Sequence, residues 1–421
     1  MPVDGTSSRL GSPVTMLREY RIALPDESRG RLLAAELVDR GHRWVRLRPV
    51  YLPHLDLANP FFGEPGFSRP ELEGWWHVTS VVDELVPDDD MEDHQLECEE
   101  VAVAAVARRH QGFCDGGSMA DRETLLRHLD LRGLLHDQTQ EQAYRRRAAI
   151  ARSFPARRVV PPPLVAAAAP VEGGLPPLLD TVRVAASRLH ADGTATPVTD
   201  WWLTGEPEHY EDDQELLSGL FDAVLHQGTC SPHTAEQVPL LAGIVGHDQV
   251  AAPYRAFLLF LLAEAGTVGR RLAARDADRR SALGLGFGQN AEETTAQNAV
   301  AAVAPALLRR WPEECEAVRC GLAFLAAGFP DSARAAGVIE PIAEMAAACA
   351  ERHRAAMMRL AHALASADGE ALRARYSEAI AGTPVRLTGI PSPVAPATAA
   401  GLHILHLMLE SETDLILQAG A

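Results

Sequence analysis

Hydrophobic and polar positions of the first third of the chain follow two different periods. HRWVRLRPV alternates, with Val45 and Leu47 on one face and Arg46 and Arg48 on the other, which predicts a half-buried strand. REYRIALP and GWWHVTSVV are interpreted as strands too. DESRGRLLAAELVDRG and MEDHQLECEEVAVAAVARRHQG are typical of helices that end at a glycine. The order strand, helix, strand, strand, helix predicts a ferredoxin-like α/β sandwich, an α+β domain over residues 17–138.

Two segments flanking this domain have no such period. Residues 1–16 are rich in Ser, Gly and Pro and are predicted to be disordered. Residues 139–177 are first basic and then rich in Pro and Ala (VVPPPLVAAAAPVEGGLPP), a composition typical of a semi-rigid linker. We therefore expect a domain boundary there.

From residue 178 to residue 421 the hydrophobic positions have helical spacing. One stripe in DQELLSGLFDAVLHQG comprises Leu216, Leu217, Leu220, Phe221, Val224 and Leu225. Prolines recur inside apolar helical segments at Pro239, Pro305 and Pro341, and the last two are 36 residues apart (341 minus 305), which suits helix-pair repeats. The prediction is a mainly α protein with a smaller α+β domain, in which a C-terminal α-solenoid follows the ferredoxin-like domain.

Both regions carry a resemblance to a known family. YEDDQELLSGLFDAVLHQGTCSPHTAEQVPLLAGIV resembles the helix pair of bacterial HEAT-repeat proteins, with a His-Gln-Gly-Thr corner at 226–229 and a Val-Pro-apolar helix at 238–240. That resemblance implies a superhelical protein-interaction scaffold. AAELVDRGHRWVRLRP, WWHVTS and VARRHQGFCDGG resemble the ribonuclease E inhibitor regulator family, although the long aromatic loop departs from that compact pattern.

Charge and composition exclude several classes of function. The net charge of −18 argues against a general nucleic-acid binder, because such binding depends on positive residues against phosphates. All 39 basic residues are arginine, so a P-loop lysine and a Schiff-base lysine are both excluded. The most apolar stretch, YRAFLLFLLAEAG, is too short to span a bilayer, and no signal peptide is evident. We expect a cytoplasmic protein.

Few residue clusters suggest chemistry. His226, Cys230 and His233 lie within eight positions, but a zinc site needs a further ligand, so we interpret HQGTCSPH as a corner between two helices. His110, Cys114 and Asp115 suggest a cysteine nucleophile with a base, yet a helix end followed by glycines explains them equally well. His403 and His406 are assigned to core or capping roles. No metal, cofactor or catalytic residue is predicted.

Aromatic residues are the candidates for partner contacts. The long loop YLPHLDLANPFFGEPGFSRPELE carries several rings, which either cover the sheet or form a contact surface. In an adjacent Trp pair on a strand, one ring faces outward unless both faces are covered. The candidate contact residues are Tyr51, Phe61, Phe62, Phe67, Trp75, Trp201, Trp202 and Trp311.

Two hypotheses for function follow. The first is a non-enzymatic interaction scaffold or regulator, whose concave solenoid surface binds a protein; the acidic charge favours a basic partner. The second is a DNA-acting enzyme resembling the HEAT-like DNA glycosylases, which would require the arginines of GRRLAARDADRR, LLRRWP and ERHRAAMMR, together with Trp311, to converge on the inner face. The mapping of arginines onto that face separates the two.

Overall fold

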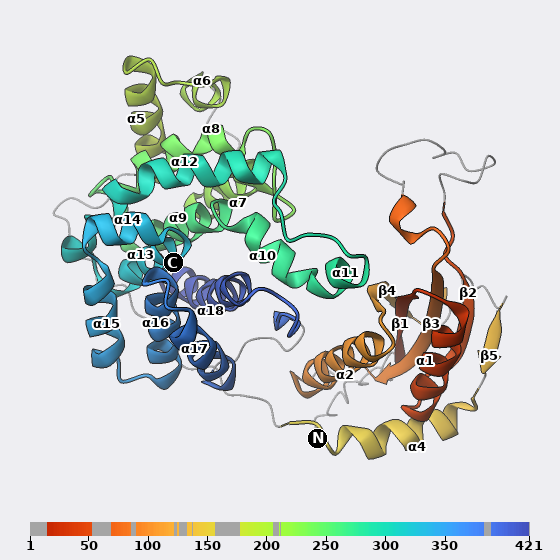
Figure 1. Ribbon diagram of the computed structural model, residues 1–421. Helices are drawn as coiled ribbons and strands as arrows, with labels where there is room; N and C mark the ends of the chain where they lie inside the picture. The colour runs from red at the N-terminus through yellow and green to blue at the C-terminus, as the bar shows by residue number, and fades with distance from the viewer. Residues whose placement is uncertain are drawn as a thin grey trace, which may run out of the picture. The chain divides into compact units, whose positions relative to one another are not determined.

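The chain divides into two compact units (Figure 1). The computed structural model describes residues 15–52, 69–85, 90–121, 124–125, 133–136, 138–155, 177–204, 210, 212–382 and 389–420. The first unit holds the described residues up to 155 together with Asp278–Leu285, and the second unit holds the other described residues from 177 onward.

The first unit is built on a five-stranded antiparallel sheet with the strand order β4-β1-β3-β2-β5. Its chain order, β1-α1-β2-β3-α2-β4, combined with the spatial order 4-1-3-2, is the ferredoxin-like topology, so that prediction is confirmed. The elements are β1 (Thr15–Leu24), α1 (Glu27–Asp39), β2 (Arg43–Pro49), the 3-10 helix η3 (Pro70–Leu72), β3 (Trp76–Leu85), α2 (Asp90–Arg109), β4 (Phe113–Asp121), β5 (Leu134–His136) and α4 (Gln140–Ala151).

Helices α1 and α2 cover one face of this sheet. Alternate residues of the strands, among them Ile22 and Val78, are buried against Leu33 of α1 and Val103 of α2. Helix α1 begins where the Asp26 side chain accepts a hydrogen bond from Arg29 N at 2.9 Å. The alternation that predicted the strands therefore also selected the residues of this core.

Both predicted boundaries of this unit need correction. Thr15 and Met16, predicted to be disordered, already belong to β1. Part of the predicted linker is the helix α4, which begins at the Thr139 cap and packs on the first unit. Arg146 Nη1 donates to Val38 O at 2.8 Å, so one of the basic residues that indicated a linker binds the carbonyl end of α1 instead.

A distant segment completes the other face of the sheet. Helix α11 (Ala277–Ala282) lies in the region predicted as solenoid, but Asp278–Leu285 belongs to the first unit. Arg108 Nη1 donates to Asp278 Oδ2 at 2.7 Å, and Leu283 packs against the apolar cluster of Phe113 and Trp75. The sequence prediction missed this segment because local periodicity does not report which distant surface a short helix covers.

The second unit consists mainly of helices stacked in two rows (Figure 1). Helices α9, α13 and α16 contact one another in succession, and so do α8, α12 and α14. The predicted mainly α fold with a smaller α+β domain is therefore confirmed. The elements are α5 (Leu178–Ala191), α6 (Pro197–Thr204), α7 (Asp213–Val224), the two-residue strands β6 (Leu225–His226) and β7 (Thr229–Cys230), α8 (Thr234–Val245), α9 (Ala252–Ala265), α10 (Val268–Arg275), α12 (Ala291–Leu308), the 3-10 helix η5 (Trp311–Glu313), α13 (Glu316–Gly328), α14 (Pro330–Ala336), α15 (Ile339–Ala348), α16 (Arg352–Ala365), α17 (Gly369–Gly382) and α18 (Ala397–Gly420).

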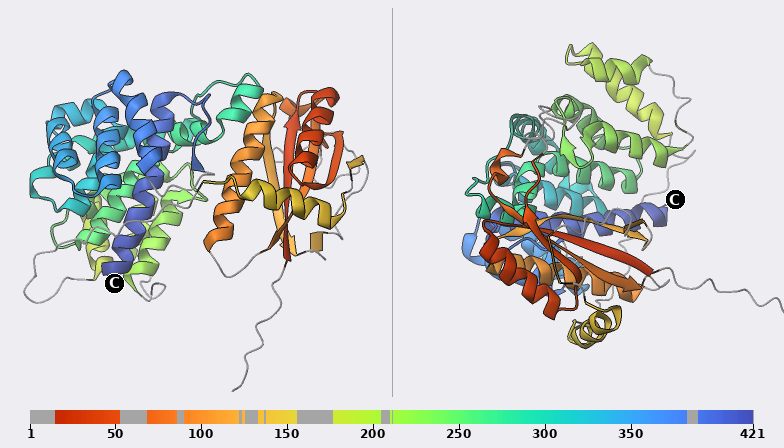
Figure 2. Two further views of the ribbon diagram at one scale, coloured as in Figure 1. Left: turned by 90° about the horizontal axis from the view of Figure 1, so that it is seen from below. Right: turned by 90° about the vertical axis from the view of Figure 1, so that its right-hand side faces the viewer.

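The last helix, α18, packs against the row formed by α9, α13 and α16, and also against α10 and α17 (Figure 2). Its residues Leu402, Ile404, Leu405 and Leu409 are buried in the same core as those helices. The chain's own helix therefore occupies a face of the stack that the solenoid prediction left available to a partner.

Candidate interaction surface

The stretch His226–His233 is a hairpin corner between α7 and α8. Gln227 and Gly228 have φ angles of 51° and 73° and connect β6 to β7, a left-handed pair that suits a two-residue turn. The buried Thr234 hydroxyl donates to Val224 O at 2.7 Å and fastens the start of α8 to the end of α7. The predicted corner is confirmed.

The same geometry gives the histidines and the cysteine of this corner no metal-binding arrangement. Among the described residues, no group of three or more His, Cys, Asp or Glu side chains could hold a metal ion. Burial raises the pKa of Cys230 to about 11, so the thiol stays protonated at neutral pH. His233 instead faces Glu236, with 3.3 Å between Nδ1 and Oε2.

The Trp201–Trp202 pair splits into one exposed and one buried ring. The pair lies on helix α6, so the argument from strand alternation does not apply to it. Trp201 is 47% exposed, whereas Trp202 is 4% exposed, and the prediction that Trp202 is a contact residue is therefore wrong. Trp202 stacks on Tyr210 with ring centroids 5.9 Å apart and touches Trp201 edge-on at 4.7 Å. The buried ring thus fixes the position of the exposed one.

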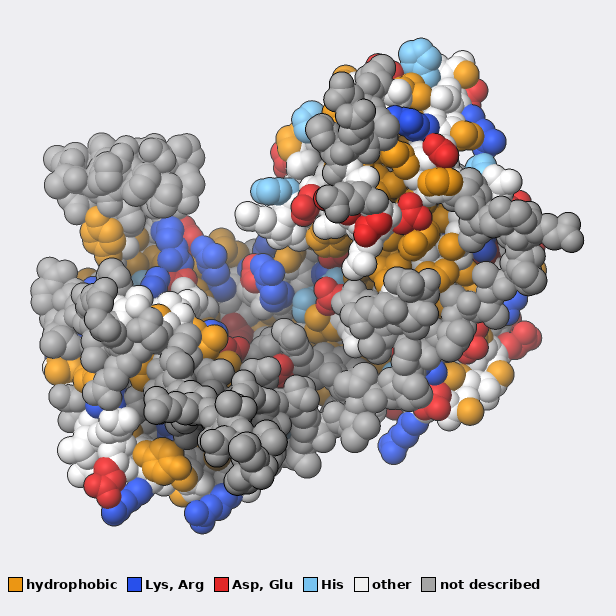
Figure 3. Space-filling view, turned by 180° about the vertical axis from the view of Figure 1, so that it is seen from behind, with side chains coloured by type: hydrophobic (Ala, Val, Ile, Leu, Met, Phe, Trp, Pro, Cys, Tyr) orange, Lys and Arg blue, Asp and Glu red, His pale blue; other side chains and the backbone are white. Residues whose placement is uncertain are grey.

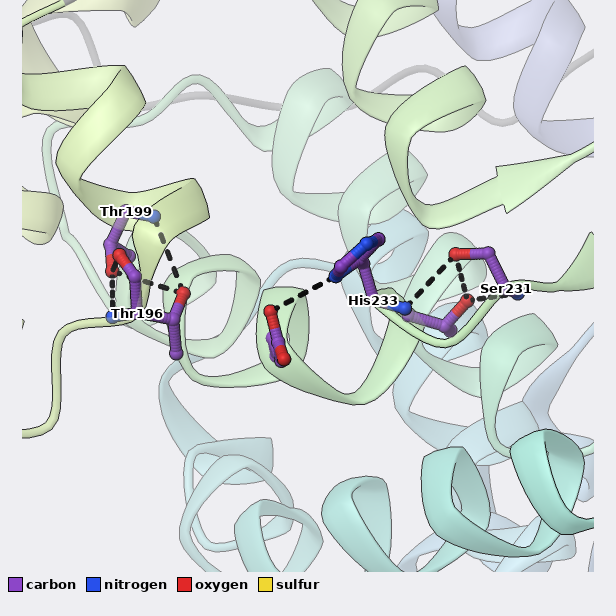
Figure 4. Close-up of polar contacts among 6 residues, drawn as sticks. Thr196, Thr199, Ser231 and His233 are labelled. Carbon is purple, nitrogen blue, oxygen red and sulfur yellow. Dashed lines mark hydrogen bonds and ion pairs between the residues drawn. The ribbon is translucent and has the colours of Figure 1, made fainter.

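A shallow depression of about 300 Å³ lies beside Trp201, lined by Pro197, Val198, Trp201 and His233. Local hydrogen bonds hold both of its sides (Figure 4). At the start of α6 the Thr199 hydroxyl donates to Thr196 O at 2.8 Å, and at the corner His233 N donates to Ser231 Oγ at 3.2 Å. We call the four residues that line the depression, Pro197, Val198, Trp201 and His233, the Trp201 surface.

The sequence around this surface is predominantly acidic. Between Arg188 and Arg255 there is no arginine or lysine, there are five histidines, and there are eleven acidic residues, at positions 192, 200, 206, 208, 211, 212, 213, 215, 222, 236 and 248. The exposed described members are Asp192, Asp200, Asp212, Glu215, Asp222 and Asp248, of which Asp248 is paired with Arg310. Acidic, histidine and arginine side chains lie among hydrophobic ones on the part of the unit formed by α5 to α8 (Figure 3), and the arginines of α5 are Arg183 and Arg188.

The other predicted contact residues have different environments. Tyr51 is exposed. Trp75 is half-buried against Phe113, with ring centroids 5.7 Å apart. Trp311 is buried in the helical core with Arg319 over its ring, so it presents no contact surface. Phe61, Phe62 and Phe67 lie outside the described residues.

The fold also brings together a serine, a histidine and a glutamate in an arrangement that resembles a catalytic triad and that no sequence motif indicated. His42 Nε2 donates to Glu99 Oε1 at 3.0 Å, and Nδ1 lies 2.8 Å from Ser80 Oγ; Arg40 binds Glu99 through two hydrogen bonds of 3.0 and 2.7 Å. His42 and Ser80 are fully buried and Glu99 is 1% exposed. A nucleophile must reach its substrate, so this His42 cluster (Arg40, His42, Ser80 and Glu99) is structural.

His110, Cys114 and Asp115, considered above as a cysteine nucleophile with a base, lie where helix α2 ends and β4 begins. His110 Nε2 bonds to Glu36 Oε1 at 2.8 Å and does not face Cys114. Asp115 receives hydrogen bonds of 2.9 Å each from Arg69 and His77. The Asp and His of that motif thus have separate partners.

A second buried cluster joins α9, α10 and α18 in the helical unit. Arg271 Nη2 donates to Glu264 Oε1 at 3.0 Å, and His406 Nε2 lies 4.0 Å from the same oxygen. Among the described residues, Glu264 Oε2, His403 Nδ1 and His406 Nδ1 are buried without a hydrogen-bond partner. We call Glu264, Arg271, His403 and His406 the His406 cluster; both histidines lie in the core, as predicted.

Comparisons of the chain with family models, with curated proteins and with solved structures found no match. Within the part of the chain that the structure describes, no helix is both long and apolar enough to cross a membrane.

Proposed function

We propose that the protein is a non-enzymatic interaction protein whose helical unit binds a basic segment of another protein at the Trp201 surface. The observation that carries the proposal is an exposed tryptophan beside an apolar depression, in a stretch of sequence that contains acidic residues and no arginine or lysine. Tryptophan is enriched among residues that dominate binding energy, and a field of one sign selects a partner of the opposite sign.

Because α18 covers the inner face of the helical stack, the proposed binding site differs from the one that the sequence hypothesis assumed. The sequence hypothesis placed the partner on a concave solenoid surface, where α18 now packs on α9, α13 and α16. The Trp201 surface lies on α6 and on the corner before α8, and α18 contributes no residue to its lining.

Two of the arginines that the glycosylase-like alternative requires are not available to DNA. That function requires arginines available to DNA phosphates on the inner face. Arg271 and Arg354 face α18 there, and both are buried in ion pairs, with Glu264 at 3.0 Å and Glu412 at 2.8 Å. Trp311 is buried as well.

The test is the binding of a defined fluorescent peptide to the intact chain. A twelve-residue peptide of alternating arginine and leucine is compared with its glutamate–leucine counterpart by fluorescence anisotropy, at low and at high salt. We expect only the basic peptide to bind, and its affinity to fall as salt screens the acidic surface. Binding of both peptides, or binding of the basic peptide unaffected by salt, contradicts the proposal.

Two variants locate the site. Trp201→Ala is expected to weaken binding of the basic peptide at least about tenfold, the size typical of a dominant contact residue. Phe287→Ala removes another exposed aromatic side chain of the same unit, outside the acidic stretch, and is expected to leave the affinity unchanged. Equal losses in both variants contradict a site at Trp201.

A further inference from the structure

We infer that the Trp201 surface recognises a cationic side chain, an arginine or a lysine of the partner, through stacking of the cation on the Trp201 ring. This inference rests on the proposed function and specifies the chemistry of its central contact. An aliphatic or aromatic anchor in the depression is the competing possibility, and the two differ in what they require of residue 201.

The first argument is how this chain treats its other aromatic rings. Arg43 lies over Trp44 with 4.1 Å between the guanidinium carbon and the ring centroid, and Arg319 lies over Trp311 at 5.9 Å. Arg270 similarly lies over Phe329 at 5.8 Å. Arginines over aromatic rings therefore recur in this chain, and Trp201, with nearly half of its side chain exposed, offers a ring to a cation of a partner.

The second argument is the charge around the ring. Asp200, which lies 3.1 Å from His190 Nδ1, precedes Trp201 on α6, and Glu236 bonds to His233, which lines the depression. A cation stacked on the indole gains from the electron-rich ring face, and the acidic stretch of sequence attracts it. An apolar anchor gains only from the ring, so the acidic surroundings favour the cation.

The third argument is mechanical support of the ring. Trp202 is buried, stacks on Tyr210 and contacts Trp201 edge-on, so the exposed indole rests on a packed base. Thr196 and Thr199 are hydrogen-bonded to each other at the start of the same helix. A ring held in place loses little conformational freedom when a ligand stacks on it.

A double-mutant cycle tests the inference. One partner of the cycle is residue 201, as Trp or as Leu. The other is the arginine–leucine peptide with a single citrulline replacing arginine at each position in turn; citrulline keeps the shape of the side chain but loses its charge. Anisotropy gives the four dissociation constants for each position.

We expect one arginine position to dominate. Its change to citrulline should weaken binding to the natural protein about fivefold more than it weakens binding to Trp201→Leu, a coupling in the range of cation–π contacts. Trp201→Phe should keep part of the coupling, because phenylalanine retains a ring face.

The possible failures separate the inference from the proposed function. If the basic peptide binds but no position couples to residue 201, or if Trp201→Leu binds as well as Trp201→Phe, then the cation does not stack on this ring and the inference is overturned. If no basic peptide binds at all, the proposed function itself is wrong. Circular dichroism of Trp201→Leu checks that the exposed substitution leaves the helical unit folded.

Discussion

Each unit of the molecule buries a histidine beside a glutamate and an arginine, but the two clusters differ in how their polar atoms are satisfied. In the His42 cluster both ring nitrogens have partners, Glu99 and Ser80, and Arg40 binds both oxygens of Glu99. In the His406 cluster one oxygen of Glu264 and one nitrogen of each histidine lack a partner among the described residues. The first arrangement stabilises charge, whereas the second leaves buried polar atoms uncompensated.

The pKa directions follow from this difference. Burial alone would raise the pKa of Glu99, but the hydrogen bonds from His42 and Arg40 outweigh it and lower the pKa to about 2. Burial raises the pKa of Glu264, and its single bond from Arg271 does not reverse the shift. A buried carboxylate thus supports the fold only where hydrogen bonds replace the water it has lost.

The largest effect on this comparison is expected from Glu99→Gln. The ionised form of Glu99 is favoured in the folded chain, with a pKa of about 2 against an ordinary 4.5, which corresponds to roughly 3 kcal/mol that the neutral amide forfeits. Hydrogen exchange measured peptide by peptide in increasing urea should show this loss in β3 and α2 and not in α9 or α18.

The control is Glu141→Gln on α4 of the same unit. Glu141 pairs with Arg145 at the surface, where an ion pair contributes about 0–1 kcal/mol. A loss for Glu99→Gln no greater than that of the control would show that the His42 cluster contributes no more than a surface pair.

A smaller effect is expected from acid on the helical unit. Burial lowers the pKa of His403 to about 4, helped by the nearby Arg271 and Arg275. Between the ordinary histidine pKa of about 6.5 and this value the unfolded chain binds more protons at this site, so stability falls as the pH falls; at pH 5 the loss that His403 contributes is roughly 2 kcal/mol. Urea unfolding of the helical unit at pH 7 and pH 5 measures it.

His403→Leu should remove the part of this pH dependence that His403 contributes. Burial lowers the pKa of His406 well below its ordinary value and also lowers that of His42, so a slope of comparable size should remain in the helical unit and a further slope in the first unit. Glu99 contributes little slope in this interval, because the unfolded carboxyl takes up protons mainly below its ordinary pKa of 4.5, where the folded carboxyl is still ionised. An unchanged slope in His403→Leu would mean that His403 titrates normally in the folded chain.

Local patterns predicted much of this fold but little of these clusters. The Asn290–Glu293 pair, spaced three residues apart, forms a capping box at the start of α12, because all four of its groups lie within one turn. At the corner, α8 begins at Thr234, and the Thr234 hydroxyl donates to the carbonyl of Val224. That bond depends on the tertiary position of α7.

The residues that sequence reasoning missed are joined across long separations. His42 meets Glu99 and Ser80 only because the sheet order places β2 beside β3, with α2 across them. No spacing in the chain encodes that meeting. The sequence indicated part of the Trp201 surface, because Trp201 was one of the candidate contact residues. It did not indicate that Trp201 and His233 line the same depression, because that depends on the tertiary fold.

The smallest expected change in stability is that of His406→Leu, and its sign should differ from that of the matching substitution His42→Leu in the other cluster. Leucine and histidine are similar in size, and leucine has no polar atom to leave unpartnered. His406→Leu removes a buried nitrogen without a partner, so its stability should be unchanged or increase by up to about 1 kcal/mol. His42→Leu instead leaves Ser80 and Glu99 buried without their histidine, and should lose about 3 kcal/mol.

Urea unfolding of the two variants at pH 7 measures the contrast, with each unit followed by hydrogen exchange of its own peptides. His406 also stacks on Phe260, with ring centroids 5.2 Å apart, and leucine forfeits that stacking. A loss for His406→Leu near 1 kcal/mol would therefore reflect the ring contact. A loss equal to that of His42→Leu would contradict the prediction and would show that the His406 ring is protonated. The Glu264 and Glu410 carboxylates lie 4.0 and 3.8 Å from His406 Nε2, and only a charged imidazole gains that much from two carboxylates at such distances.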